Sequence, residues 1–246
     1  MTLGRGLGWV RTPAAALLLG LPLALLPAAP ALGVIPAAPK VRAEMARRNV
    51  QAGRTRPLVL DLLLVGESGG AIASGRARLD PGGMAWLELI RSDGGREVHE
   101  RSPAGYAATR DGVRLDRAMP LLPPTQLLQA PTEAEVAAAL EGIGGDPEQL
   151  DLGLCDDADC WVLGGRDPGS SAERGRPSYW FDLESRQPVR IDEPRRARYR
   201  FGPSVARDGG IAFPAWIEVE APGWSRRRLE VQRVAPAGPT SRPPGP

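Results

Sequence analysis

Period-two alternation of apolar and charged side chains over the second half of the chain is the feature that most constrains its fold. Tyr199 and Phe201 alternate with arginines, and Ile217 and Val219 alternate with glutamates. Successive side chains of a strand point to opposite faces, so this pattern predicts strands with one apolar and one solvated face. The segments that carry it are 178–183, 189–192, 198–201, 217–220 and 229–232, and the apolar run 161–163 before them is a further expected strand. They predict an antiparallel sheet with one buried face.

The first half of the mature chain predicts a second meander. Its apolar or alternating runs are separated by turn-forming residues at 66–70 (GESGG) and 80–83 (DPGG). The expected strands are 58–65, 71–79, 84–91, 96–101, 105–109 and 112–115.

Helical signals lie before and between these meanders. Residues 40–51 predict a short helix, and 126–129 predict an apolar helical turn. Thr132, with Glu133 and Glu135 after it, predicts the N-cap of a helix over 134–140. The segment MPLLPP at 119–124 cannot be a helix interior or a central strand, because proline lacks the backbone donor.

These elements predict a mainly β (α+β) fold. A long meander has one apolar face to cover, and three short helical segments are available to cover it. We therefore expect a strongly curved antiparallel sheet that forms an unclosed β-barrel covered by a few short helices. The interior is either a cavity for an apolar ligand or a filled core, and alternation does not separate the two.

The candidate ligand-binding set consists of apolar residues assigned to the buried face. Ordinary core packing is the alternative for each one. The set is Leu60, Leu62, Leu87, Leu89, Tyr179, Phe181, Val189, Ile191, Tyr199, Phe201, Ile217, Val219, Leu229 and Val231. The segment 119–124 is either a lid over this interior or a plain connector.

Cys155 and Cys160 flank an acidic stretch, and we expect a disulfide that pins a hairpin corner. The alternative is calcium binding by Asp156, Asp157 and Asp159, since Ca²⁺ prefers oxygen ligands. The usual calcium-loop spacing is absent, so no metal site is predicted.

The first 33 residues predict a secretory signal peptide. Arg5 and Arg11 precede a leucine-rich apolar run, and small residues follow at 31–33. An uncleaved anchor is the alternative. We expect cleavage near Gly33, a linker at 34–39, a single domain at 40–234 and a disordered tail at 235–246. The predicted location is the periplasm, in soluble form, because no lipobox cysteine follows the apolar run.

The residue inventory excludes several function classes. Net charge is +2, and removing the signal leaves equal numbers of basic and acidic residues, which argues against nucleic-acid binding. One histidine and two cysteines cannot form a four-ligand zinc site of cysteines, or of two cysteines and two histidines. We expect His99 to be a solvated strand residue. The chain is therefore predicted not to be an enzyme, and to use no cofactor.

The carboxyl half also carries motifs that resemble a known family. They are WVLGG at 161–165, YWFDLESRQPVRI at 179–191, FPAWIEV at 213–219 and RLEV at 228–231. Together with the amino-terminal helix, the first meander and the Pro-Leu loop, they resemble the LolA/LolB-like superfamily of exported lipoprotein carriers and lipid-binding proteins. The resemblance spans roughly residues 41–234.

The resemblance implies an eleven-stranded unclosed barrel with a helical lid over a cavity that takes acyl chains. In the carrier pattern an arginine latches the lid; the matching stretch 81–86 (PGGMAW) keeps the turn and an aromatic residue but has no arginine. The function implied is a periplasmic carrier that moves lipoprotein or lipid acyl chains towards the outer membrane. The implied partners are an inner-membrane donor and an outer-membrane acceptor, and the carrier is expected to be a monomer. The alternative is a non-carrier envelope protein of this fold that acts as a sensor or protein-interaction module.

Overall fold

Turns of Gly, Asp and Pro reverse the chain between antiparallel strands in the computed structural model, which describes residues 35–156, 158–165 and 176–238. At the turn after Leu79, Gly83 has a φ of 85°, a left-handed conformation that glycine adopts without steric cost. The strands of the first half are β1 (Leu58–Val65), β2 (Ala71–Leu79), β3 (Ala85–Arg91), β4 (Arg96–Ser102), β5 (Gly105–Arg110) and β6 (Val113–Arg114).

The second half supplies the remaining strands. These are β7 (Asp146–Cys155), β8 (Ala158–Gly164), β9 (Ser178–Asp182), β10 (Pro188–Glu193), β11 (Ala197–Phe201), β12 (Ser204–Ala206), β13 (Ala212–Pro214), β14 (Trp216–Glu220) and β15 (Arg227–Pro236). A short 3₁₀ turn, η1 (Asp208–Gly210), joins β12 to β13.

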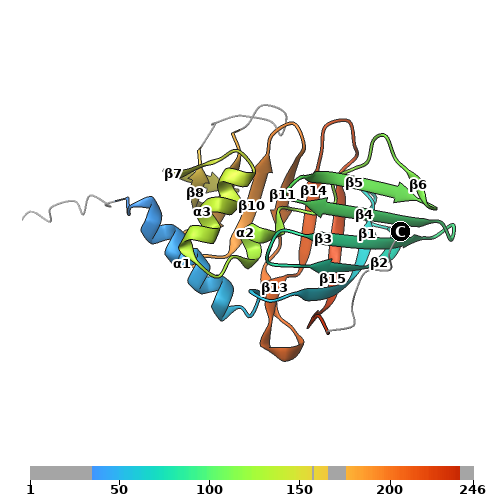
Figure 1. Ribbon diagram of the computed structural model, residues 1–246, viewed down its shortest axis with the longest axis horizontal. Coiled ribbons are helices and arrows are strands. Elements are labelled where there is room, and N and C mark those ends of the chain that lie inside the picture. The colour runs from blue at the N-terminus through green and yellow to red at the C-terminus, as the bar shows by residue number, and fades with distance from the viewer. Residues whose placement is uncertain (1–34, 157, 166–175, 239–246) are drawn as a thin grey trace, which may run out of the picture. The chain divides into compact units, whose positions relative to one another are not determined.

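One antiparallel sheet joins the two meanders. Within the described ranges it has thirteen strands in the order β6-β5-β4-β3-β2-β1-β15-β14-β11-β10-β9-β8-β7, while β12 pairs with β13 alone. The first and last strands of the chain, β1 and β15, therefore lie side by side in the middle of the sheet (Figure 1). Strands β6 and β7 form its two edges, so the sheet does not close.

The register brings the alternating residues together on one face. Ile217 lies opposite both Leu229 and Phe201, and Tyr199 lies opposite both Ile191 and Val219. These cross-strand pairs are buried, whereas their neighbours Arg200 and Glu218 pair on the opposite face. The fold class predicted from alternation is therefore confirmed.

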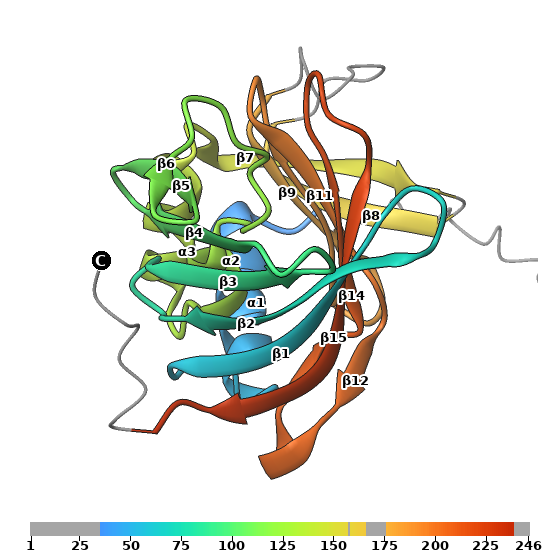
Figure 2. The ribbon, with the colours of Figure 1, turned by 90° about the vertical axis from the view of Figure 1, so that its right-hand side faces the viewer.

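Three helices in the described part of the chain cover the apolar face: α1 (Ala38–Gln51), α2 (Thr125–Gln129) and α3 (Glu133–Gly142). They lie together on the concave side of the sheet (Figures 1 and 2). The capping prediction is confirmed, because the Thr132 hydroxyl accepts from the Glu135 N–H and the Glu135 carboxylate accepts from the Thr132 N–H.

Several boundaries differ from expectation. Helix α1 begins at Ala38, inside the expected linker, and Pro39 suits its first turn because the first-turn N–H groups have no helical partner. Strand β15 continues to Pro236, which pairs with Leu58, so the first two residues of the expected tail belong to the sheet. The thirteen strands exceed the eleven that the resemblance implies, and β7, β12 and β13 were not predicted. The predicted signal peptide lies outside the described residues.

Candidate functional site

Most of the candidate ligand-binding residues lie in one apolar interior. Thirteen of the fourteen belong to a single buried cluster, and none of those is more than 6% exposed. They come from β1, β3, β9, β10, β11, β14 and β15. These side chains are almost inaccessible to solvent in this conformation, so an acyl chain would reach them only if a covering segment moved.

Val189 is the exception, and its assignment to this interior is wrong. A β-bulge between Pro188 and Arg190 breaks the alternation of β10, and Val189 packs instead with Cys155, Cys160, Val162 and Trp180. A bulge places an extra residue in one strand, which shifts the face of the side chains on one side of it.

The covering segments share the same interior. Buried residues of α1, α2, α3 and the loop before α2 belong to the same apolar cluster. The larger of these residues are Val41, Met45, Met119, Leu121, Leu122, Leu127, Leu128 and Leu140. The proline-rich loop 119–124 is therefore part of the cover rather than a plain connector.

Side chains of β4 and β5 hold this loop in place. The Tyr106 hydroxyl accepts a hydrogen bond from the Leu121 N–H at 2.8 Å and lies 3.2 Å from the Met119 carbonyl oxygen. Arg101 Nη1 donates to the Leu122 carbonyl at 3.1 Å. We call these contacts of Tyr106 and Arg101 with residues 119–122 the closure.

Arg101 also contacts residues of the other half of the sheet. Arg101 Nη2 forms a buried ion pair of 2.9 Å with Glu193 at the end of β10, and Arg101 Nη1 lies 3.4 Å from the Tyr199 hydroxyl. Burial alone lowers the pKa of Arg101, but Tyr199 and Glu193 outweigh it and raise that pKa. Burial also raises the pKa of Tyr106 and of Tyr199, so both phenols stay neutral and able to donate hydrogen bonds. A single side chain thus joins the loop to both halves of the sheet.

The expectation of a solvated His99 is wrong. This residue is completely buried beneath the closure, with Nδ1 2.8 Å from the Tyr106 hydroxyl and Nε2 2.8 Å from a Glu97 carboxylate oxygen. The hydrogen bond from His99, followed by the contacts with Arg110, lowers the pKa of Glu97 to about 2. His99 therefore supports the tyrosine that holds the loop.

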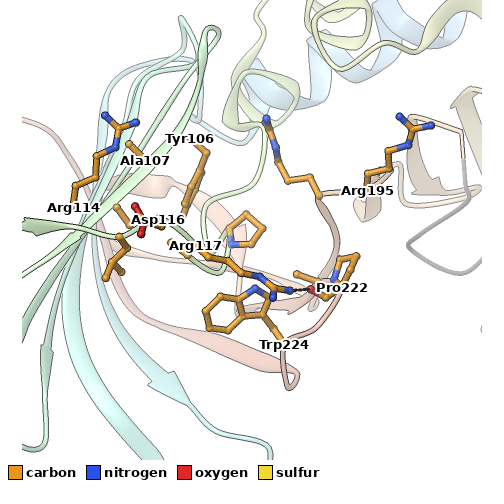
Figure 3. A pocket seen from close by; sticks show the side chains of 14 residues that line it. Tyr106, Ala107, Arg114, Asp116, Arg117, Arg195, Pro222 and Trp224 are labelled. Carbon is orange, nitrogen blue, oxygen red and sulfur yellow. Dashed lines mark hydrogen bonds between the residues drawn. The ribbon is translucent and has the colours of Figure 1, made fainter.

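Two pockets lie beside the closure, and Tyr106 borders both. The first, of about 620 Å³, lies between the segment after β6 and the turns before β11 and β15. Figure 3 shows Arg114, Arg117 and Arg195 around it, with Arg117 next to Trp224 and hydrogen-bonded to the Pro222 carbonyl oxygen.

The second pocket, of about 480 Å³, is bordered by Met84, Trp86 and Arg101. Tyr106 is hydrogen-bonded to the loop and contributes to the walls of both pockets. Movement of the loop would therefore change the shape of each pocket.

The predicted disulfide between Cys155 and Cys160 is present and joins β7 to β8. Asp157, one of the three candidate calcium ligands, lies outside the described residues. In the part of the chain that the structure describes, no group of three or more His, Cys, Asp or Glu side chains is placed to hold a metal ion.

Sequence reasoning missed Arg101, Tyr106 and Glu193. Their burial depends on strand register, which a single strand's sequence does not reveal. Leu87 of β3 is buried and pairs with His99 of β4, so His99 lies on the buried face of the sheet. Arg101, two positions further along β4, therefore faces the same side. A search confined to stretch 81–86 could not find this arginine, because Arg101 lies on the next strand.

Comparison with known proteins yields similarity in fold. No family model matches the sequence, and no curated protein matches it. Among solved structures, a LolA superfamily protein from Nitrosomonas europaea is 12% identical with a TM-score of 0.48, and the alignment covers 83% of this chain and 95% of that one.

Two further solved structures are similar. A putative outer membrane lipoprotein-sorting protein domain from Vibrio parahaemolyticus is 9% identical, with a TM-score of 0.45, covering 80% of this chain and 92% of that one. A DUF1329 family protein from Desulfovibrio piger is 13% identical, with a TM-score of 0.43, covering 81% and 93%. Among the described residues, no helix is long and apolar enough to cross a membrane.

Proposed function

We propose that the chain is a periplasmic carrier that holds the acyl chains of lipids or lipoproteins inside the curved sheet and moves them towards the outer membrane. The observation that carries this proposal is the closure. A proline-rich cover lies over an apolar interior, and a few side-chain hydrogen bonds hold it there. Such a cover can open without breaking the sheet.

The energetics suit a reversible carrier. Burial stabilises an acyl chain by about 0.8 kcal/mol per CH₂ group, so a long chain offsets the loss of a few hydrogen bonds in the cover. The resemblance to lipoprotein carriers supplies the proposed route, with export by the predicted signal peptide, an inner-membrane donor and an outer-membrane acceptor. We propose no catalytic residue.

The first test is recovery of bound lipid. The chain from Val34 onward, expressed in a bacterial periplasm and purified without detergent, should yield phospholipid, fatty acid or acylated peptide near one-to-one. Lipid extraction with mass spectrometry, alongside native mass, measures the ratio. Protein free of lipid that also fails to bind a fluorescent fatty acid would reject the carrier proposal. A stable protein partner would then favour the sensor or interaction module.

A matched pair of variants locates the binding site. Leu127→Gln places a polar group in a completely buried position of α2, whereas Leu154→Gln makes the same change at a leucine of β7 that is 63% exposed. We expect the first variant to lose most fatty-acid binding and the second to retain it, with circular dichroism confirming that both are folded. Equal binding by both folded variants would place the ligand outside this interior.

A further inference from the structure

Three arginines of the described chain are almost fully buried, and one of them lacks an acidic partner. Arg42 pairs with Glu133 and Glu148, and Arg101 pairs with Glu193. Arg54, in the turn between α1 and β1, is 2% exposed and forms no ion pair with any residue in the described ranges. Buried charges in proteins are normally paired, so this unpaired charge requires an explanation.

The guanidinium of Arg54 is only partly satisfied. Its Nη2 donates to the Asn49 side-chain oxygen at 2.9 Å, whereas Nε and Nη1 have no hydrogen-bond partner among the described residues. The remaining donors of this buried cation are therefore available to an acceptor that the described residues do not supply.

The covering helix fixes this region. Asn49 donates to the carbonyl oxygens of Leu127 and Ala130, and Gln129 of α2 donates to the carbonyl oxygen of Arg54. Three further buried atoms of α2, Thr125 Oγ1, Gln126 Oε1 and Gln129 Oε1, also lack a partner in the described chain. The arginine is thus held next to the segment that must move for a ligand to enter the interior.

The electrostatic surroundings leave the charge unbalanced. The titratable group that acts on Arg54 is Tyr179, a residue of the apolar interior. Burial raises the pKa of Tyr179, so its phenol is neutral and contributes no negative charge at neutral pH. Burial lowers the pKa of Arg54, yet an arginine side chain remains protonated in proteins.

We propose that Arg54 is the interior anchor for the carboxylate of a long-chain fatty acid, with Tyr179 beside it and the acyl chain in the apolar interior. This inference rests on the proposed function and names the class of ligand. A carboxylate offers two acceptor oxygens and one negative charge, which match the free donors and the unbalanced charge of Arg54. A phosphate head group shares this chemistry, but it is bulkier and needs more donors than Arg54 and Tyr179 supply.

The test compares ligands that differ only in the head group. Hexadecanoate, hexadecanol and hexadecanoyl lysophosphatidate displace a fluorescent probe from the mature chain, from Arg54→Met, and from Arg76→Met as a control at an exposed arginine. We expect wild type and control to bind hexadecanoate at least about tenfold more tightly than hexadecanol, as a charge-assisted hydrogen bond implies. Arg54→Met should lose this preference and keep its affinity for hexadecanol.

Thermal unfolding supplies a second readout. Hexadecanoate should raise the Tm of wild type and of Arg76→Met more than hexadecanol does, and the two ligands should act equally on Arg54→Met. Arg54→Lys, which keeps the charge, should recover part of the preference for the carboxylate.

Three other outcomes would reject the anchor, the carboxylate assignment or the proposed function, respectively. If wild type binds the acid and the alcohol equally, or Arg54→Met keeps the preference, the anchor is rejected and the carrier proposal stands. If lysophosphatidate binds most tightly and loses its advantage in Arg54→Met, the carboxylate assignment is wrong. If wild type binds none of the three ligands, the proposed function itself fails.

Discussion

The closure around Arg101 and the region around Arg54 each contain a buried arginine, but the two arginines have different partners. Both arginines are at most 4% exposed and lie next to a segment that covers the apolar interior. Arg101 has a carboxylate partner, a phenol and a loop carbonyl, whereas Arg54 has a single amide oxygen. Among the described residues, the hydrogen-bond and charge partners of Arg101 are present and those of Arg54 are incomplete.

This difference separates a structural cation from one suited to a ligand. Removing one member of a buried ion pair leaves an uncompensated charge, so the pair resists change on either side. An unpaired buried cation destabilises the free protein and gains most when an anion arrives. The two arginines should therefore respond in opposite directions when each is replaced by an apolar side chain of similar length.

The largest effect is expected at the closure. Arg101→Met leaves Glu193 buried with the partly exposed Arg196 as its one cation partner among the described residues, and it releases the Leu122 carbonyl. We expect the free energy of unfolding to fall by about 3 kcal/mol, measured by urea denaturation. A loss below about 1 kcal/mol, typical of an exposed pair, would show that the closure contributes little.

The opposite sign is expected at Arg54. Arg54→Met removes an unpaired buried charge, which should raise the free energy of unfolding of the lipid-free protein by about 2 kcal/mol, although the Asn49 side-chain oxygen loses its donor. The same denaturation experiment measures it. A destabilisation equal to that of Arg101→Met would remove the distinction between the two regions.

Tyr106→Phe tests the closure without changing charge. The substitution leaves the buried Leu121 N–H without its 2.8 Å acceptor, which should cost about 1.5 kcal/mol. Hydrogen exchange of the Leu121 amide should accelerate, and uptake of a fluorescent fatty acid should become faster because the loop opens more often. Unchanged exchange at Leu121 would contradict the role assigned to the tyrosine.

The smallest effect is expected at Glu97, and it depends on pH. Its pKa is lowered in the folded state from 4.5 to about 2, so the carboxylate stabilises the fold above pH 4.5 and loses that contribution as the pH falls towards 2. Glu97→Gln should destabilise by on the order of 1 kcal/mol at neutral pH, after allowance for solvent screening. The difference in unfolding free energy between Glu97→Gln and wild type should shrink as the pH falls from 4.5 towards 2. A difference independent of pH would show that the lowered pKa of Glu97 is not its cause.

Local signals were sufficient for most of the secondary structure. Strand alternation, the glycine and aspartate turns and the Thr132 capping box depend on neighbours a few residues away, and the structure has these features where they were predicted. Strand β7 was missed although Leu150, Leu152 and Leu154 alternate in it. Leu152 and Leu154 are exposed at a sheet edge, where alternation does not mark a buried face.

The candidate site was predicted only in part. The apolar interior follows from alternation, and thirteen of its fourteen candidate residues lie there together. Val189 was misplaced because a bulge is set by strand pairing, which the sequence of one strand does not reveal. His99 was misjudged for a similar reason, since its burial depends on the loop that crosses above it.

The sequence by itself determined the class of sheet, the turns, the capped helix and the apolar residues, because each depends on side-chain periodicity or on short-range backbone chemistry. Tertiary structure decided which charges are buried and what they contact. Arg101 reaches Glu193 across 92 residues of sequence, and Arg54 lies beneath a helix that begins 71 positions later. Contacts over such separations arise only when the sheet curves and its cover folds back, so no local pattern distinguishes the paired arginine from the unpaired one.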